Sequence, residues 1–316
     1  MRGIGRRALE LAVLVWVCGC ASVSTPAFRQ PDRPVELSDT PFFAQTEYHC
    51  GPAALATMLT AEDVAVTPDQ LAPLIYVPGR EGSLQAEVIS AARRYQRLPL
   101  RLAPEVDALI TALQAGHPVL VLQNLGLRRW PLWHYAVLVG YEPQHDRFIL
   151  RSGGTPREQM RAARFISSWE LAGRWALVLA EPGQIPAFAQ AEHWLAAAAP
   201  FESLGQLAIA ERAYSAATLR WPDSSLSWQA LANLRYAQSD RAGAEQALRR
   251  AIELHPQAAA ARNNLASLLL ERGCPTAARA QLEVLREVPV NLRAALTDTR
   301  NSIEAAASAD ASDCPP

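Results

Sequence analysis

The chain has 316 residues, a formal net charge of −1 and an apolar content of 50%. Its length and apolar content are sufficient for two folded domains, and its near-neutral charge gives no electrostatic support for a nucleic-acid partner. The sequence contains no lysine. That absence excludes phosphate-binding Gly-Lys-Thr loops, Ser-Lys hydrolases and Schiff-base chemistry.

Residues 1–20 have the features of an export signal. Three arginines, Arg2, Arg6 and Arg7, precede the apolar stretch LAVLVWV, which is too short to remain as a membrane-spanning helix. The stretch is followed by Cys18-Gly19-Cys20, a sequence that resembles the cleavage box of bacterial lipoproteins. The resemblance implies lipidation of Cys20, a lipid anchor in the membrane and, without a following aspartate, an outer-membrane position facing the periplasm. An ordinary secretory signal is the alternative, and it also exports the protein.

Export affects how the cysteines are interpreted. After cleavage at Cys20 the chain retains Cys20, Cys50, Cys274 and Cys314. If Cys20 is acylated and Cys50 is free, Cys274 and Cys314 remain as a possible disulfide that holds the C-terminal tail in an oxidising compartment. The cysteines have no CxxC spacing, and no metal site or cofactor is indicated.

After a Pro- and Ser-rich tether at 21–40, residues 41–181 have a mixed pattern that predicts an α+β fold. Helices are expected first and antiparallel strands after them. The predicted helices span 51–60, 68–76, 83–96 and 105–115, and the predicted strands span 118–123, 134–141, 147–152, 158–164 and 174–180.

A Pro- and Gly-containing linker at 182–189 separates this domain from an alanine-rich helical region. Equivalent positions recur every 34 residues, as in Trp194, Trp228 and Arg262. The pattern resembles the tetratricopeptide repeat and predicts an all-α solenoid of three repeats at 190–289, followed by a capping helix and tail at 290–316. The resemblance implies that the repeats bind a protein partner.

Within the first domain, the stretch QTEYHCGPAAL places Cys50 directly before Gly-Pro and a predicted helix. A buried cysteine that only fills the core is the simpler interpretation. The start of a helix, however, favours the thiolate, so the position predicts a lowered pKa for Cys50. Gln45 lies close enough upstream to form an oxyanion hole with the Cys50 backbone N–H, and His134 begins an apolar strand in HYAVLVGY.

These residues resemble the bacteriocin-processing, double-glycine-leader peptidases of the papain-like superfamily. The resemblance covers about 39–180 and implies a cysteine peptidase domain. It assigns Cys50 as nucleophile, His134 as general base and acid, and Gln45 as oxyanion donor. The family normally supplies an aspartate after the next strand, where this chain has Ser152. Ser152 could orient the imidazole, but a hydroxyl stabilises imidazolium less than a carboxylate does.

The sequence therefore predicts an exported, lipid-anchored cysteine peptidase that cleaves envelope peptides or proteins. The loop before His134 carries Trp130 and Trp133, which are candidates for substrate contact. A non-catalytic scaffold that binds peptides is the first alternative, because the acid is replaced. A Cys-His acyl transferase is the second. In each case, removal of the repeats is expected to leave a first domain that still folds.

Overall fold

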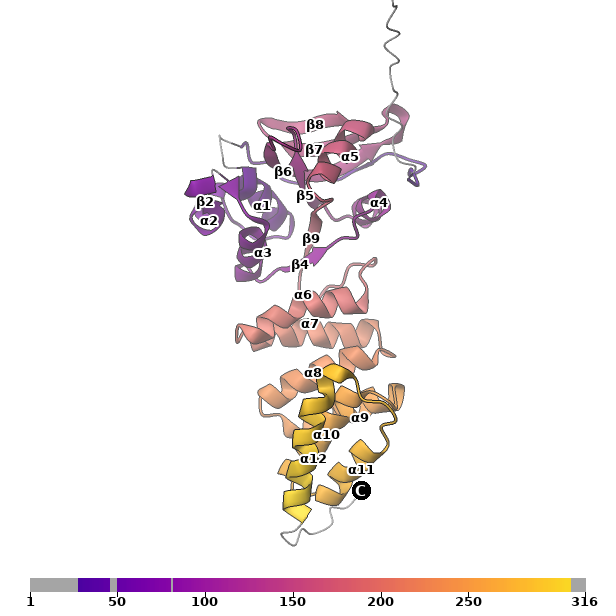
Figure 1. The fold of residues 1–316 in the computed structure, drawn as a ribbon. Coiled ribbons are helices and arrows are strands. Elements are labelled where there is room, and N and C mark those ends of the chain that lie inside the picture. Colours follow the sequence, from indigo (N-terminus) through magenta and orange to yellow (C-terminus); the bar gives the residue numbers. More distant parts are fainter. Residues whose placement is uncertain (1–27, 46–49, 81, 308–316) are drawn as a thin grey trace, which may run out of the picture.

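The computed structural model of the protein describes residues 28–45, 50–80 and 82–307. Its first domain is built on an antiparallel sheet with helices on both faces (Figure 1). The strand order is β4-β9-β5-β6-β7-β8, and β1 pairs with the distal end of β6. The strands are β1 (Val35–Glu36), β4 (Leu98–Arg101), β5 (Val119–Asn124), β6 (Trp133–Glu142), β7 (Arg147–Ser152), β8 (Thr155–Arg161) and β9 (Ala176–Ala180), and a separate hairpin is formed by β2 (Tyr76–Val77) and β3 (Gly82–Ser83).

Alternation along β6 separates two apolar cores, because successive side chains of a strand point to opposite faces. Tyr135 and Val137 belong to the core beneath α1, whereas Ala136 and Leu138 belong to the core that includes α4 and α5. In Figure 1, α1, α2 and α3 lie on one side of the sheet, and α4 and α5 on the other. Their bounds are α1 (Cys50–Ala61), α2 (Pro68–Ile75), α3 (Gln85–Arg94), α4 (Val106–Gln114) and α5 (Ala162–Leu171).

The α+β fold is confirmed, but several elements differ from the prediction. The strand expected at 158–164 occupies Thr155–Arg161 and is followed directly by α5, which was not predicted. The short strand β4 was also missed. It contains Pro99, which a sheet tolerates there because β4 is an edge strand.

The helical region repeats with the predicted period. The first helices of the three repeats begin 34 residues apart, and so do their second helices. The turn within each repeat has one residue with positive φ: Gly205 (71°), Ser239 (67°) and Gly273 (78°). The helices are α6 (Ala191–Ser203), α7 (Leu207–Arg220), α8 (Ser225–Ala237), α9 (Arg241–Leu254), α10 (Ala259–Glu271), α11 (Pro275–Glu283) and α12 (Arg293–Ala307).

Hydrogen bonds explain why an arginine can take the place of a tryptophan in the repeat pattern. Trp228 donates its indole N–H to the carbonyl of Pro222, and Arg262 donates its Nε–H to the carbonyl of Pro256. Both side chains therefore fix the entry to the first helix of a repeat. The third repeat is irregular, because α11 ends at Glu283, well before Pro289. None of the described helices is both long and apolar enough to cross a bilayer.

The two regions share one apolar core. A continuous cluster of buried side chains runs from Leu98 and Leu100 in β4 to Trp194 and Phe201 in α6, and on to Leu231 in α8. Figure 1 shows α6 directly beside β4. Whether the first domain folds without the repeats stays a prediction, and this shared core bears on it.

Candidate active site

Cys50 is the first residue of α1 and is partly buried. The following residue must be glycine, because a Cβ on Gly51 would lie 2.3 Å from the Ser83 Oγ of the β2–β3 hairpin. The hairpin therefore packs directly against the start of the helix. This contact fixes where the thiol emerges beside β6.

His134 lies near the start of β6, paired in register with Gln123 of β5. Its Nε2 atom is 2.9 Å from the Ser152 hydroxyl at the end of β7. Ser152 is thus the hydrogen-bond partner of the imidazole, in the position where an aspartate was expected. Asp146 lies at the other end of β6 and β7, where it accepts a hydrogen bond from the Tyr141 hydroxyl.

Gln45 is held at the same corner of the sheet. Its Nε2 donates to the Tyr135 carbonyl (3.2 Å), and its Oε1 accepts from the Gly153 backbone N–H (3.0 Å). The Gln45 backbone N–H donates to the Gly153 carbonyl (2.9 Å). One amide hydrogen of the side chain remains for a substrate oxygen.

The Cys50 thiol lies against the backbone N–H of Tyr135, the residue that follows His134. Within the described part of the chain, however, no hydrogen bond joins Cys50 to His134. Because Nε2 is engaged with Ser152, Nδ1 is the imidazole atom left to receive the thiol proton. The structure therefore brings the four predicted residues to one corner without forming the Cys-His contact itself.

Burial raises the pKa of the Cys50 thiol, and the nearby N–H groups of Tyr135 and Gly51 only partly oppose this effect. The expected lowering of this pKa is therefore wrong, because loss of hydration outweighs the helix N-terminus. Burial also lowers the pKa of His134, against a smaller opposing effect from Glu158. Both changes favour a neutral thiol and a neutral imidazole over an ion pair.

The loop between β5 and β6 presents apolar side chains next to His134. Trp130 is 69% exposed and Trp133 is 53% exposed. The loop is held in shape by Asn124, whose Oδ1 accepts hydrogen bonds from the backbone N–H groups of Gly126 and Leu132. An ordered apolar surface therefore adjoins the candidate site.

Two of the predicted cysteine roles involve residues outside the described part of the chain. Cys20 and Cys314 both lie there, so lipidation and the Cys274–Cys314 disulfide stay predictions. Cys274 itself is buried at the start of α11.

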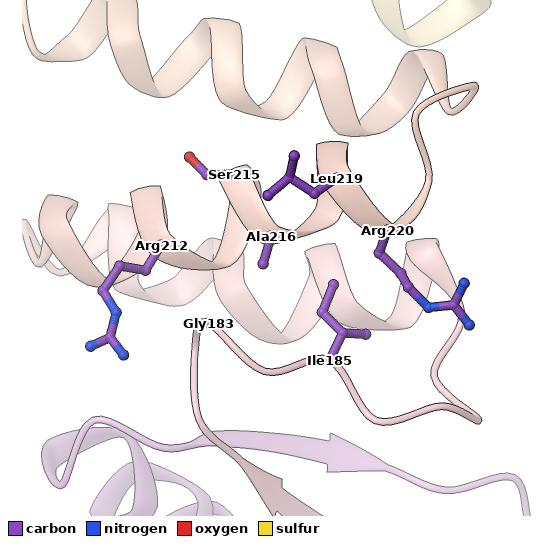
Figure 2. Close-up of a pocket in the computed structure, with 7 residues that line it drawn as sticks. All are labelled: Gly183, Ile185, Arg212, Ser215, Ala216, Leu219 and Arg220. Carbon is purple, nitrogen blue, oxygen red and sulfur yellow. The ribbon is translucent and has the colours of Figure 1, made fainter.

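A cavity of about 540 Å³ lies away from these residues, between the loop after β9 and α7 (Figure 2). Ile185, Ala216 and Leu219 form its apolar part, and Arg212 and Arg220 stand at its two ends. Arg212 is paired with Glu181. None of the predicted site residues lines this cavity, so it has no part in the candidate chemistry.

Two side chains near His134 were missed by the sequence analysis. Gln123 is fully buried and donates to the Ser168 hydroxyl (2.7 Å). Glu158 influences the His134 imidazole electrostatically. Only strand pairing reveals them, since neither belongs to a motif.

Comparison with protein families agrees with this geometry: residues 37–177 match the model of the Peptidase_C39 like family. The chain carries a C39-like peptidase domain. Among solved structures, a C39-like peptidase from Bacillus anthracis is 18% identical, with a TM-score of 0.40, over 48% of this chain and 98% of that chain.

Two further solved structures are similar to the helical region. The TPR2B domain of yeast Sti1, in its pHsp70 complex, is 17% identical with a TM-score of 0.34, over 38% of this chain and 98% of its own. MamA is 15% identical with a TM-score of 0.30, over 38% of this chain and 80% of its own. No curated protein matches the sequence.

Proposed function

We propose that the protein is a cysteine peptidase of the cell envelope, anchored by a lipid on Cys20, whose repeats bind a protein partner or substrate. One observation carries the catalytic part of this proposal. Gln45, Cys50, His134 and Ser152 come from four separate segments and meet around the first residues of β6 and the last of β7. The matching family model at 37–177 supports the same reaction class.

The first chemical step is attack by the Cys50 sulfur on a substrate carbonyl carbon. His134 Nδ1 takes the thiol proton as the S–C bond forms, and Ser152 holds the opposite ring nitrogen. The carbonyl oxygen becomes an oxyanion, which accepts hydrogen bonds from the Gln45 side chain and the Cys50 backbone N–H.

The second step releases the amine product. The imidazolium of His134 returns its proton to the leaving nitrogen as the C–N bond breaks, which leaves an acyl group on Cys50. His134 then removes a proton from water, and the resulting attack on the acyl carbon breaks the S–C bond and releases the carboxylic acid product. The imidazolium returns its proton to the departing sulfur. The thiol is thereby regenerated without any cofactor.

The substrate class follows from the surface beside His134. Trp130 and Trp133 provide an ordered apolar surface that suits a peptide with apolar side chains near the cut. The arginines of the same loop, Arg128 and Arg129, form no ion pair within the described residues. The repeats supply a second, separate surface for protein contact.

A non-catalytic peptide-binding role is the second candidate. It is favoured by the raised pKa of Cys50 and by the missing hydrogen bond between Cys50 and His134. The two candidates differ in whether covalent chemistry occurs at the sulfur.

The deciding experiment uses the purified chain and a library of peptides, with products identified by mass spectrometry. We expect cleavage by the wild type, and at least a 10³-fold loss in Cys50→Ala, because the nucleophile is absent. Ser215→Ala, a substitution within α7 and away from the candidate site, is the control and should retain activity. Peptide binding without cleavage in both wild type and Cys50→Ala would support the scaffold, and amide products in the presence of an amine would support acyl transfer.

A further inference from the structure

Glu158 in β8 is a half-buried carboxylate. It forms no hydrogen bond or ion pair with any described residue. In register it opposes Leu150 of β7, on the face of β7 that also carries Ser152 two residues further on. The β7–β8 pairing is irregular between these two positions, and Ser152 itself pairs with Thr155. That face also carries His134, whose imidazole contacts Ser152.

The curvature of the sheet brings β8 toward the start of β6. Met160, two residues after Glu158 and on the same face, lies with its sulfur 3.6 Å from the Gln123 Nε2 of β5. Gln123 is in turn the cross-strand neighbour of His134. Two independent contacts, Met160 with Gln123 and Ser152 with His134, therefore place the middle of β8 close to the imidazole.

The groups around His134 leave Glu158 as the carboxylate that acts on it. Its negative charge opposes the effect of burial on the His134 pKa. The other polar side chains on the neighbouring strands are Gln123 of β5 and Ser152 of β7, and Ser168 of α5 lies behind Gln123. The Cys50 thiol of α1 lies at the N–H of Tyr135, the next residue after His134. The exposed Arg128 and Arg129 belong to the adjoining loop.

We propose that Glu158 is a positioning residue that supplies, across Ser152, the negative charge which the aspartate of related sites would provide to the histidine. The proposal rests on the proposed peptidase function. The Ser152 oxygen accepts the Nε2–H of His134, and the Glu158 carboxylate stabilises the imidazolium that forms as Cys50 attacks. No proton is transferred to Glu158.

The first test is independent of activity. The His134 imidazole is titrated by NMR in the full chain for the wild type, Glu158→Gln and Glu142→Gln. Glu142→Gln is the matched control, since it removes a carboxylate at the other end of β6. We expect the His134 midpoint to fall in Glu158→Gln and to stay unchanged in the control. An unchanged midpoint in folded Glu158→Gln would overturn the proposal, whether or not the chain cleaves peptides.

The second test uses peptide cleavage. Glu158→Gln is expected to reduce kcat about tenfold with little change in KM, because the lost charge acts on the transition state. Glu158→Asp should recover part of the loss. Ser152→Asp in the Glu158→Gln background should restore kcat, since it places a carboxylate directly at Nε2. A change in KM without a fall in kcat would contradict a role through His134. Failure of Ser152→Asp to restore kcat would also contradict it.

Discussion

Burial acts in opposite directions on the pKa values of Cys50 and His134, and this determines the resting form of the site. The thiol is kept protonated and the imidazole is kept neutral. In the proposed mechanism, the nucleophile therefore forms only when His134 takes the proton. Such a site avoids a standing thiolate, which is the form that oxidants attack most readily.

This resting form predicts a specific pH dependence. The base is the neutral imidazole, and its pKa lies below the ordinary 6.5, so kcat/KM should rise with pH to a half-maximum below pH 6.5. Alkylation of Cys50 by iodoacetamide should instead have a midpoint above 9.0, because it reports the thiolate. Cys50→Ala provides the background rate. Fast alkylation that is constant from pH 5 to 8 would indicate an ion pair and contradict this description.

At the residue level, the sequence was sufficient to predict which residues form the candidate site. It was insufficient to predict how the surrounding residues affect their pKa values. Gln45, Cys50 and His134 could be identified from short stretches because the residue types and their order are distinctive. The direction of the Cys50 pKa could not, because it depends on packing by Tyr135 and other distant residues. Glu158 was missed for the same reason, since its relation to His134 exists only through the pairing of three strands.

Among the elements, α5 shows how a visible signal can be overlooked. Ala162, Phe165, Ile166 and Trp169 are buried and have helical spacing, yet the segment was divided between a strand and a loop. The 34-residue repeats were easier to predict from the sequence, because several positions recur together. The positive φ values of their turns also recur, with a serine in the middle repeat where the other two have glycine.

That serine predicts a stabilising substitution. Ser239 adopts φ 67°, a conformation that costs energy for any residue with a Cβ and little for glycine. Ser239→Gly should increase the free energy of unfolding by about 0.5–1 kcal/mol, measured by urea denaturation. Ser215→Gly, within α7, is the control and should decrease it by about 0.5 kcal/mol. A destabilised Ser239→Gly variant would show that the hydroxyl has an unrecognised role.

In the whole molecule, the apolar core that joins β4 to α6 makes the two regions interdependent. Leu98 and Leu100 are buried by contacts that continue to Trp194 and Phe201. The linker at 182–189 is a boundary in sequence and composition. It does not separate two cores.

Truncation tests this joint. A fragment of residues 28–186 should unfold at a temperature at least 10 °C below that of the full chain. It loses the cover over β4, and each large apolar side chain so exposed costs roughly 1.5–3 kcal/mol. A fragment of residues 28–255, which keeps α6 to α9, should remain within a few degrees of the full chain. Equal melting temperatures for the two fragments, measured by circular dichroism, would show that the first domain is self-sufficient.

A shared core of this kind leaves no hinge at the joint. A protein bound to the repeats would therefore be held at a fixed distance and orientation relative to the Cys50 thiol. Selection of the scissile bond would then depend on spacing from the capture point as well as on the residues around the cut. Inserting or deleting residues between those two points of a substrate would move or abolish the cut.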